Sequence, residues 1–166
     1  MIVRSSLAAA HRPRLLFISG HTIWPPIHGS AVRMWNLIRH LSLEFEIHAF
    51  VFIGGTDDPD QRAALAPYCS DVFFQQVPPA AETDSSLPLI FRQFASPRIR
   101  DRIAALVSAH ELELVLMEGS ELVGLIPDDD TTPTVVAAHD LLFQSYWRRR
   151  RSSFRRFGGE RNLAHS

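Results

Sequence analysis

Three short stretches of this 166-residue chain carry side chains that can bind or move charge. The first is HTIWPPIHGSAVR, residues 21–33, in which Gly29 lets a ligand approach the backbone closely. Ser30 is expected to cap the next helix, and the free amides of its first turn can face an anion. Arg33 follows in that turn and opposes the helix dipole, so a negative group is expected nearby. These features indicate a phosphate-bearing ligand; an ordinary strand-to-helix loop with Arg33 in solvent is the alternative.

The second stretch is MEGS, which follows an apolar run typical of a buried strand. Glu118 stands just past that run, and Gly119 with Ser120 can open a helix. The Glu118 carboxylate can bind a sugar hydroxyl or a positively charged partner. The alternative is a helix-capping turn with a solvated Glu118.

The third stretch is His139-Asp140, at the end of another strand-like run. A histidine beside a carboxylate can act as a base or orient an acceptor hydroxyl, and Asp140 can also cap the following helix. His21 and His28 have a spacing that can hold a metal, but no third ligand is evident near them in the sequence. No metal site is therefore predicted.

The segment WRRRRSSFRRF, residues 147–157, interleaves aromatic residues with arginines. On a helix, its first four arginines (Arg148, Arg149, Arg150 and Arg151) can contact an anionic membrane or the acceptor. A solvated basic face that covers apolar surface with arginine stems is the alternative. No RNA-binding or helix-turn-helix motif accompanies it, so no nucleic-acid partner is expected.

Strand-like and helix-like segments alternate along the chain. Strands are expected at 14–20, 45–53, 71–77, 112–120 and 132–140, and helices from Ser30, across 59–68, from Ser96-Pro97 and from Leu141. Such alternation predicts an α/β fold: a Rossmann-like parallel sheet with helices on both faces. The glycine fingerprints of generic nicotinamide enzymes and P-loop NTPases are absent, which disfavours both classes.

Composition fits one compact soluble domain. The chain is 46% hydrophobic with a formal net charge of −1, which gives no support for nucleic-acid binding. Cys69 is the single cysteine, so neither an internal disulfide nor a thiolate metal cluster is expected. Residues 1–12 are expected to form a flexible leader, because their apolar patch is too short for a signal peptide or a membrane span.

Two motifs in order carry a family resemblance. The pattern P-P-x-x-G-x-x-x-R opens an amphipathic helix, and L-x-x-x-x-E-I-H-x-F-x-F follows it. Together they resemble the start of family 4 glycosyltransferases of the GT-B class, in particular bacterial transferases of polysaccharide assembly. LVLMEGS and VVAAHDLLFQSYWRRRR look like later landmarks of the same amino-terminal domain. The resemblance covers residues 13–160 and leaves 161–166 as a tail.

The resemblance implies one half of a GT-B architecture, in which two Rossmann-like domains face each other across a cleft. The amino-terminal half binds a hydroxyl acceptor, glycan or lipid-linked, and the other half binds a nucleotide sugar without a metal or other cofactor. By motif, Gly29 lies in the glycine loop near the donor phosphates, and His139 matches a histidine near the transferred sugar, with Asp140 as its neighbour. Arg33 helps to hold an anion. The implied reaction retains configuration and takes place in the cytoplasm, including the inner face of the membrane.

The family's donor-sugar motif, E-x(7)-E, belongs to its carboxyl-terminal donor domain, and the resemblance ends before that domain. The expectation is therefore an acceptor-side domain without its carboxyl-terminal donor domain, inactive alone. It is one domain of a longer enzyme, a subunit completed by a separate donor-domain subunit, or a truncated product. Two alternatives stay open. One is half of a sugar-nucleotide 2-epimerase, and the other is a non-catalytic Rossmann-like domain that binds a sugar, a lipid or a protein.

Overall fold

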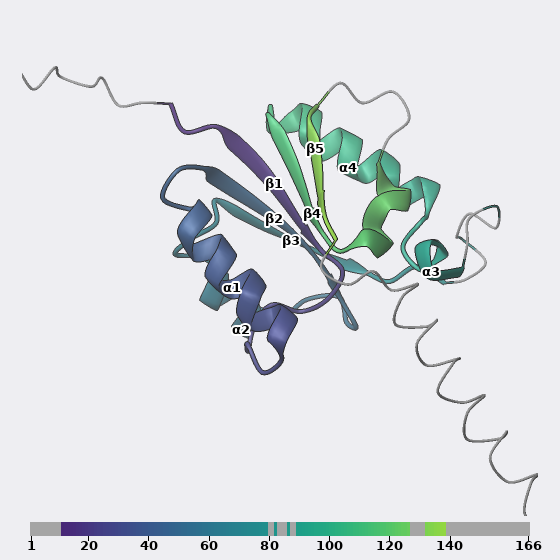
Figure 1. Ribbon diagram of the computed structural model, residues 1–166, viewed down its shortest axis with the longest axis horizontal. Coiled ribbons are helices and arrows are strands. Elements are labelled where there is room, and N and C mark those ends of the chain that lie inside the picture. The colour runs from purple at the N-terminus through teal and green to yellow at the C-terminus, as the bar shows by residue number, and fades with distance from the viewer. Residues whose placement is uncertain (1–10, 80–81, 83–85, 87–88, 127–131, 139–166) are drawn as a thin grey trace, which may run out of the picture.

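A five-stranded, entirely parallel sheet forms the centre of the molecule (Figure 1). The computed structural model describes residues 11–79, 82, 86, 89–126 and 132–138. The strands are β1 (Arg14–Ser19), β2 (Glu46–Ile53), β3 (Asp71–Gln76), β4 (Leu114–Glu118) and β5 (Thr134–Ala137). Their order across the sheet is β3-β2-β1-β4-β5. The predicted Rossmann-like α/β class is confirmed.

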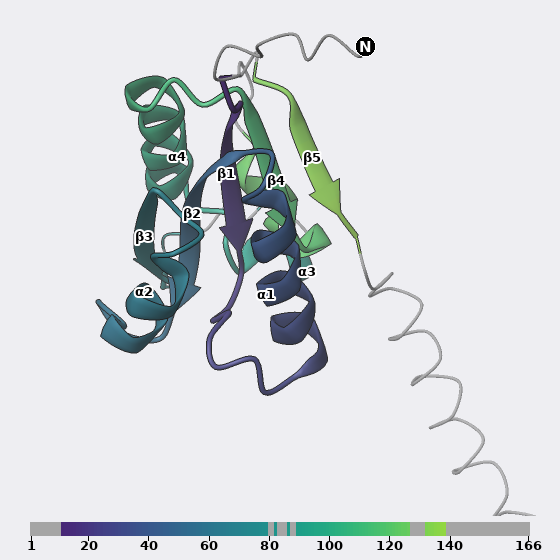
Figure 2. The ribbon, with the colours of Figure 1, turned by 90° about the vertical axis from the view of Figure 1, so that its left-hand side faces the viewer.

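Helices cover both faces of the sheet (Figure 2). On one face lie α1 (Gly29–Leu41) and α2 (Pro59–Leu65). On the other lie α3 (Leu89–Arg92), α4 (Pro97–Ala109) and the 3-10 helix η2 (Ser120–Leu125). The short helix α3 was not predicted from the sequence.

Two apolar cores follow from this layering. Alternate residues of a strand point to opposite faces, so β1 sends Leu16 and Ile18 into the core under α4, and Leu15 and Phe17 into the core under α1. All four side chains are fully buried, and each burial contributes about 1.5–3 kcal/mol. This double burial explains why β1 is continuously apolar from Leu15 to Ile18.

The predicted start of α1 needs a correction. The capping residue is His28, whose Nδ1 accepts a hydrogen bond from the Ala31 amide at 3.3 Å. Ser30 is already inside the helix, so its expected capping role is wrong. The predicted apolar stripe holds, because Ala31 and Ile38 are fully buried against the sheet.

Parallel pairing brings all the strand carboxyl ends to one edge, and that edge positions the candidate site. At the other edge, residues 11 and 12 of the expected leader make contacts: His11 Nε2 lies 3.1 Å from Glu113, and Arg12 donates to the Ser42 carbonyl. Across the described ranges, every helix is too short or too polar to span a bilayer. His139, Asp140, Arg148–Arg151 and the helix expected from Leu141 lie outside the described residues.

Candidate functional site at the carboxyl edge of the sheet

A buried glutamine holds the loop that joins β1 to α1 in place. The Gln61 Oε1 atom accepts hydrogen bonds from the backbone amides of Ile23 and Trp24. Gln61 is fully buried in α2, whose first turn is capped by Asp58. Gln61 was not predicted from the sequence as a functional residue, because an isolated glutamine on a short helix matches no motif. The consequence is a loop whose path is determined by an element more than thirty residues away.

Gly29 faces open space at the start of α1. A Cβ atom built on Gly29 meets nothing within 4 Å. The φ of Gly29 is not positive, because Gly119 is the one glycine among the described residues that has a positive φ. Neither packing nor backbone geometry in this domain therefore requires glycine at position 29, which leaves room there for a ligand against the helix amides.

Three polar side chains gather beside that open position. Ser30 Oγ lies 3.0 Å from His21 Nε2 and 2.9 Å from His28 Nδ1. His28 Nδ1 also accepts from the Ala31 amide, so the proton of this ring belongs on Nε2. Burial lowers the pKa of His21, the His28 ring lowers it further, and the Glu121 carboxylate opposes this shift. A hydrogen-bonding cluster thus borders the first turn of α1.

The negative group expected near Arg33 is Glu118 of the same chain. Arg33 Nη1 donates a hydrogen bond to Glu118 Oε2. This contact links the beginning of α1 to the end of β4. The Glu118 side chain is 1% exposed, so the alternative of a solvated glutamate is wrong. The Arg33 side chain keeps 44% exposure, so a ligand from solvent can still reach it. A role for Arg33 toward a ligand phosphate stays a prediction.

Gly119 has a structural reason to be glycine. Its φ is +137°, and a Cβ there would overlap the carboxylate of Glu121. The turn from β4 into η2 depends on it, and Ser120 begins η2 as predicted. The glycine of MEGS is thereby explained without a ligand, unlike Gly29.

A cavity of about 610 Å³ opens farther along the same edge, where β3 ends and α4 begins. Gln76, Arg98 and Arg102 are among its lining residues. Arg102 also donates to the Phe74 carbonyl at 3.2 Å, which ties α4 to β3. The size suits a small organic ligand, and the two arginines favour a polar or anionic one.

Fold and site together define an open, parallel α/β domain with an open position at Gly29, at the carboxyl edge of its sheet. No protein-family model matches the chain, and no curated protein matches it. Among solved structures, the chain is similar to UGT2 of Phytolacca americana complexed with UDP-2-fluoro-glucose and pterostilbene. That alignment has 13% identity and a TM-score of 0.37, over 64% of this chain and 26% of the other.

A second similar structure is the NADH-dependent reductase A1-R′ complexed with NAD. Its alignment has 12% identity and a TM-score of 0.32, over 70% of this chain and 42% of the reductase. The chain therefore spans less than half the length of either protein. At such scores the fold assignment depends on the sheet topology of this chain itself.

Proposed function

We propose that this chain is the acceptor-side domain of a glycosyltransferase that moves a sugar from a nucleotide sugar to a hydroxyl acceptor. The observation that carries the proposal is the open space at Gly29, beside the first amides of α1. A donor phosphate placed there meets backbone N–H groups and the positive end of the helix dipole. Negative charge grows on the leaving phosphate during transfer, so donors already in place lower the barrier.

The other residues take roles in keeping with their positions. Ser30 and His21 border the phosphate position, and Arg33 adds positive charge from the next turn. The cavity beside Arg98 and Arg102 receives the acceptor. By the motif resemblance, His139 lies near the transferred sugar with Asp140 as its neighbour. A histidine beside a carboxylate can act as a base on the acceptor hydroxyl, and a donor-binding domain supplies the sugar.

The first test is nucleotide-sugar binding, measured by isothermal titration calorimetry with UDP-glucose, GDP-mannose and pyrophosphate. Gly29→Trp fills the open position with a large side chain, so binding should weaken at least tenfold. Leu43→Trp is the matched control, because it adds the same side chain to an exposed position past the other end of α1. Equal binding by the wild type and Gly29→Trp, or no binding of any of the three probes, would overturn the phosphate position.

The reaction itself is tested with radiolabelled nucleotide sugars and extracts that contain lipid-linked and glycan acceptors. Transfer of label to a hydroxyl acceptor, abolished by Gly29→Trp, is the expected result. Epimerised donor without transfer would identify the epimerase alternative. Nucleotide-sugar binding with no turnover in any combination of subunits would identify a binding domain.

A further inference from the structure

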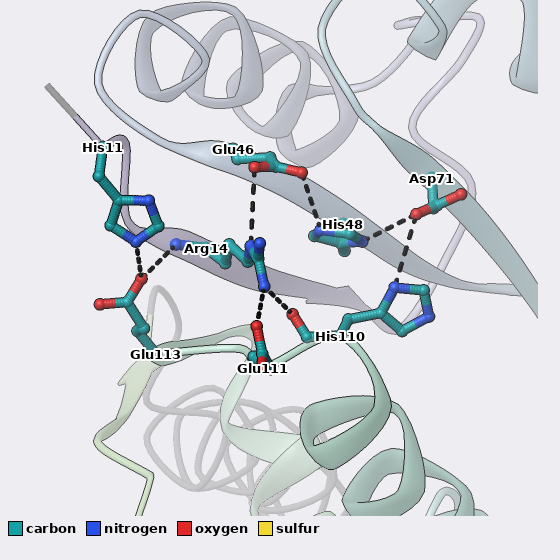
Figure 3. A network of polar contacts seen from close by, with 8 residues as sticks. All are labelled: His11, Arg14, Glu46, His48, Asp71, His110, Glu111 and Glu113. Atoms are coloured by element: carbon teal, nitrogen blue, oxygen red, sulfur yellow. Dashed lines mark hydrogen bonds and ion pairs between the residues drawn. The ribbon is translucent and has the colours of Figure 1, made fainter. Parts of the chain in front are cut away.

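Two histidines and an aspartate meet at the edge of the sheet opposite the candidate site. His48 is near the start of β2, Asp71 begins β3, and His110 ends α4. The strand register pairs His48 directly with Asp71. Because His48 alternates with Phe50 and Phe52, it faces the same side as α4. Figure 3 shows the rings of His48 and His110 both directed toward the Asp71 carboxylate.

The distances fit metal coordination. His48 Nδ1 lies 3.0 Å and His110 Nδ1 lies 3.8 Å from the same Asp71 oxygen, Oδ2. One ligand atom from each of the three residues lies within 4.8 Å of the others. Ligands arranged tetrahedrally around zinc, with bonds of about 2.1 Å, stand about 3.4 Å apart. Small side-chain rotations therefore suffice to close the three groups around one ion.

The His48 ring is an unusual group to bury without a ligand. Its side chain is 4% exposed, and neither ring nitrogen has a hydrogen bond of acceptable geometry among the described residues. Glu46 Oε1 stands 3.6 Å from Nε2, where it can orient the ring from behind.

We propose that His48, Asp71 and His110 bind a divalent transition-metal ion, with zinc as the preferred ion and water as the fourth ligand. Two imidazoles and one carboxylate are a zinc donor set, whereas magnesium and calcium prefer oxygen ligands. His110 and Asp71 are 31% and 44% exposed, which gives the ion a path in from solvent. The ion would link β2 and β3 to the end of α4, at the edge of the sheet opposite Gly29.

The test uses untagged full chain, stripped with EDTA and titrated calorimetrically with zinc. One zinc per chain should bind, and the melting temperature should rise by at least about 5 °C when zinc is a hundredfold above its Kd. Cobalt should give the intense visible absorption of a four-coordinate site. Zinc binding should weaken at least tenfold in His110→Gln and in Asp71→Asn, which change partly exposed side chains and spare the buried ring.

Two further variants locate the ion. His40→Gln changes an exposed histidine on α1 and should bind zinc like the wild type. His21→Gln removes a member of the other histidine cluster and should also leave binding intact. The proposal is overturned if the wild type binds no zinc, if His110→Gln binds it normally, or if His21→Gln abolishes binding. None of these outcomes depends on whether nucleotide sugars bind near Gly29.

Discussion

The buried carboxylate of Glu118 shapes the electrostatics of the candidate site. An ionised carboxylate out of water is costly unless it is paired, and Arg33 supplies the pair from α1. The same contact explains why an arginine is tolerated close to the positive end of a helix. The Arg33–Glu118 pair thus joins α1 to β4 at the edge where a ligand would bind.

Removing one member of this pair should cost more than removing both. Arg33→Met leaves the Glu118 charge buried without its arginine, so the free energy of unfolding should fall by about 3 kcal/mol. The double variant Arg33→Met/Glu118→Gln removes that charge and should recover more than half of the loss. Urea denaturation measures both.

Arg39→Met is the control for the Arg33 variant, because Arg39 is an exposed arginine on the same helix. It should change stability by less than about 1 kcal/mol. If Arg33→Met costs no more than Arg39→Met, the pair contributes little and Glu118 is satisfied in another way.

Gly119 and Gly29 both lie at the carboxyl edge but in different structural elements. The fold requires glycine at position 119 and does not require it at position 29. Gly119 turns β4 into η2 with a positive φ, and Gly29 begins α1 in open space. Gly119→Ala should lower the free energy of unfolding by about 1–3 kcal/mol, because alanine is strained at a φ of +137°. Gly29→Ala should change it by less than about 1 kcal/mol.

Thermal and urea unfolding of the two alanine variants, run side by side, test this contrast. Gly29→Ala also serves as the fold control for the larger Gly29→Trp. A loss of stability in Gly29→Ala equal to that in Gly119→Ala would mean that the fold requires the glycine of α1, and the case for a ligand there would weaken.

Most elements could be predicted because each has its own periodicity. Apolar runs such as 14–19 and the stripe of α1 require no knowledge of distant residues. The helix start was misplaced because imidazole Nδ1 can cap as serine does, and His28 precedes Ser30. Helix α3 has four residues, too few to show a period.

The candidate site was harder to predict, since its contacts join distant segments. Glu118 was singled out, but its burial depends on Arg33, 85 positions earlier. The grouping of His48, Asp71 and His110 exists only because β2 and β3 pair and α4 returns to their amino ends. No local spacing in the sequence could reveal it.

On the scale of the whole molecule, the core under α1 and α2 contains the single cysteine. Cys69 follows α2 and packs with Leu65 and Phe74. Burial raises the pKa of its thiol to about 12. The thiolate is the reactive form, so at pH 8 only about one native molecule in 10⁴ carries it.

Alkylation of Cys69 should therefore report opening of this core. With iodoacetamide at pH 8, the native protein should react at least about 100-fold more slowly than the protein unfolded in guanidinium. The rate should rise with denaturant in parallel with the loss of circular dichroism. Glutathione in the same solutions controls for the reagent, and rapid labelling without denaturant would contradict the burial of Cys69.

The strand order has a consequence for synthesis on the ribosome. Central strand β1 is made first, yet its register pairs Leu15 with Ile47 on one side and with Leu114 on the other. At translation rates of about 5–20 residues per second, the partner on the β4 side arrives roughly 5–20 s after β1 emerges. Through that interval the nascent chain exposes an apolar strand with one open edge, so chaperones that shield such segments should bind it until β4 has been made.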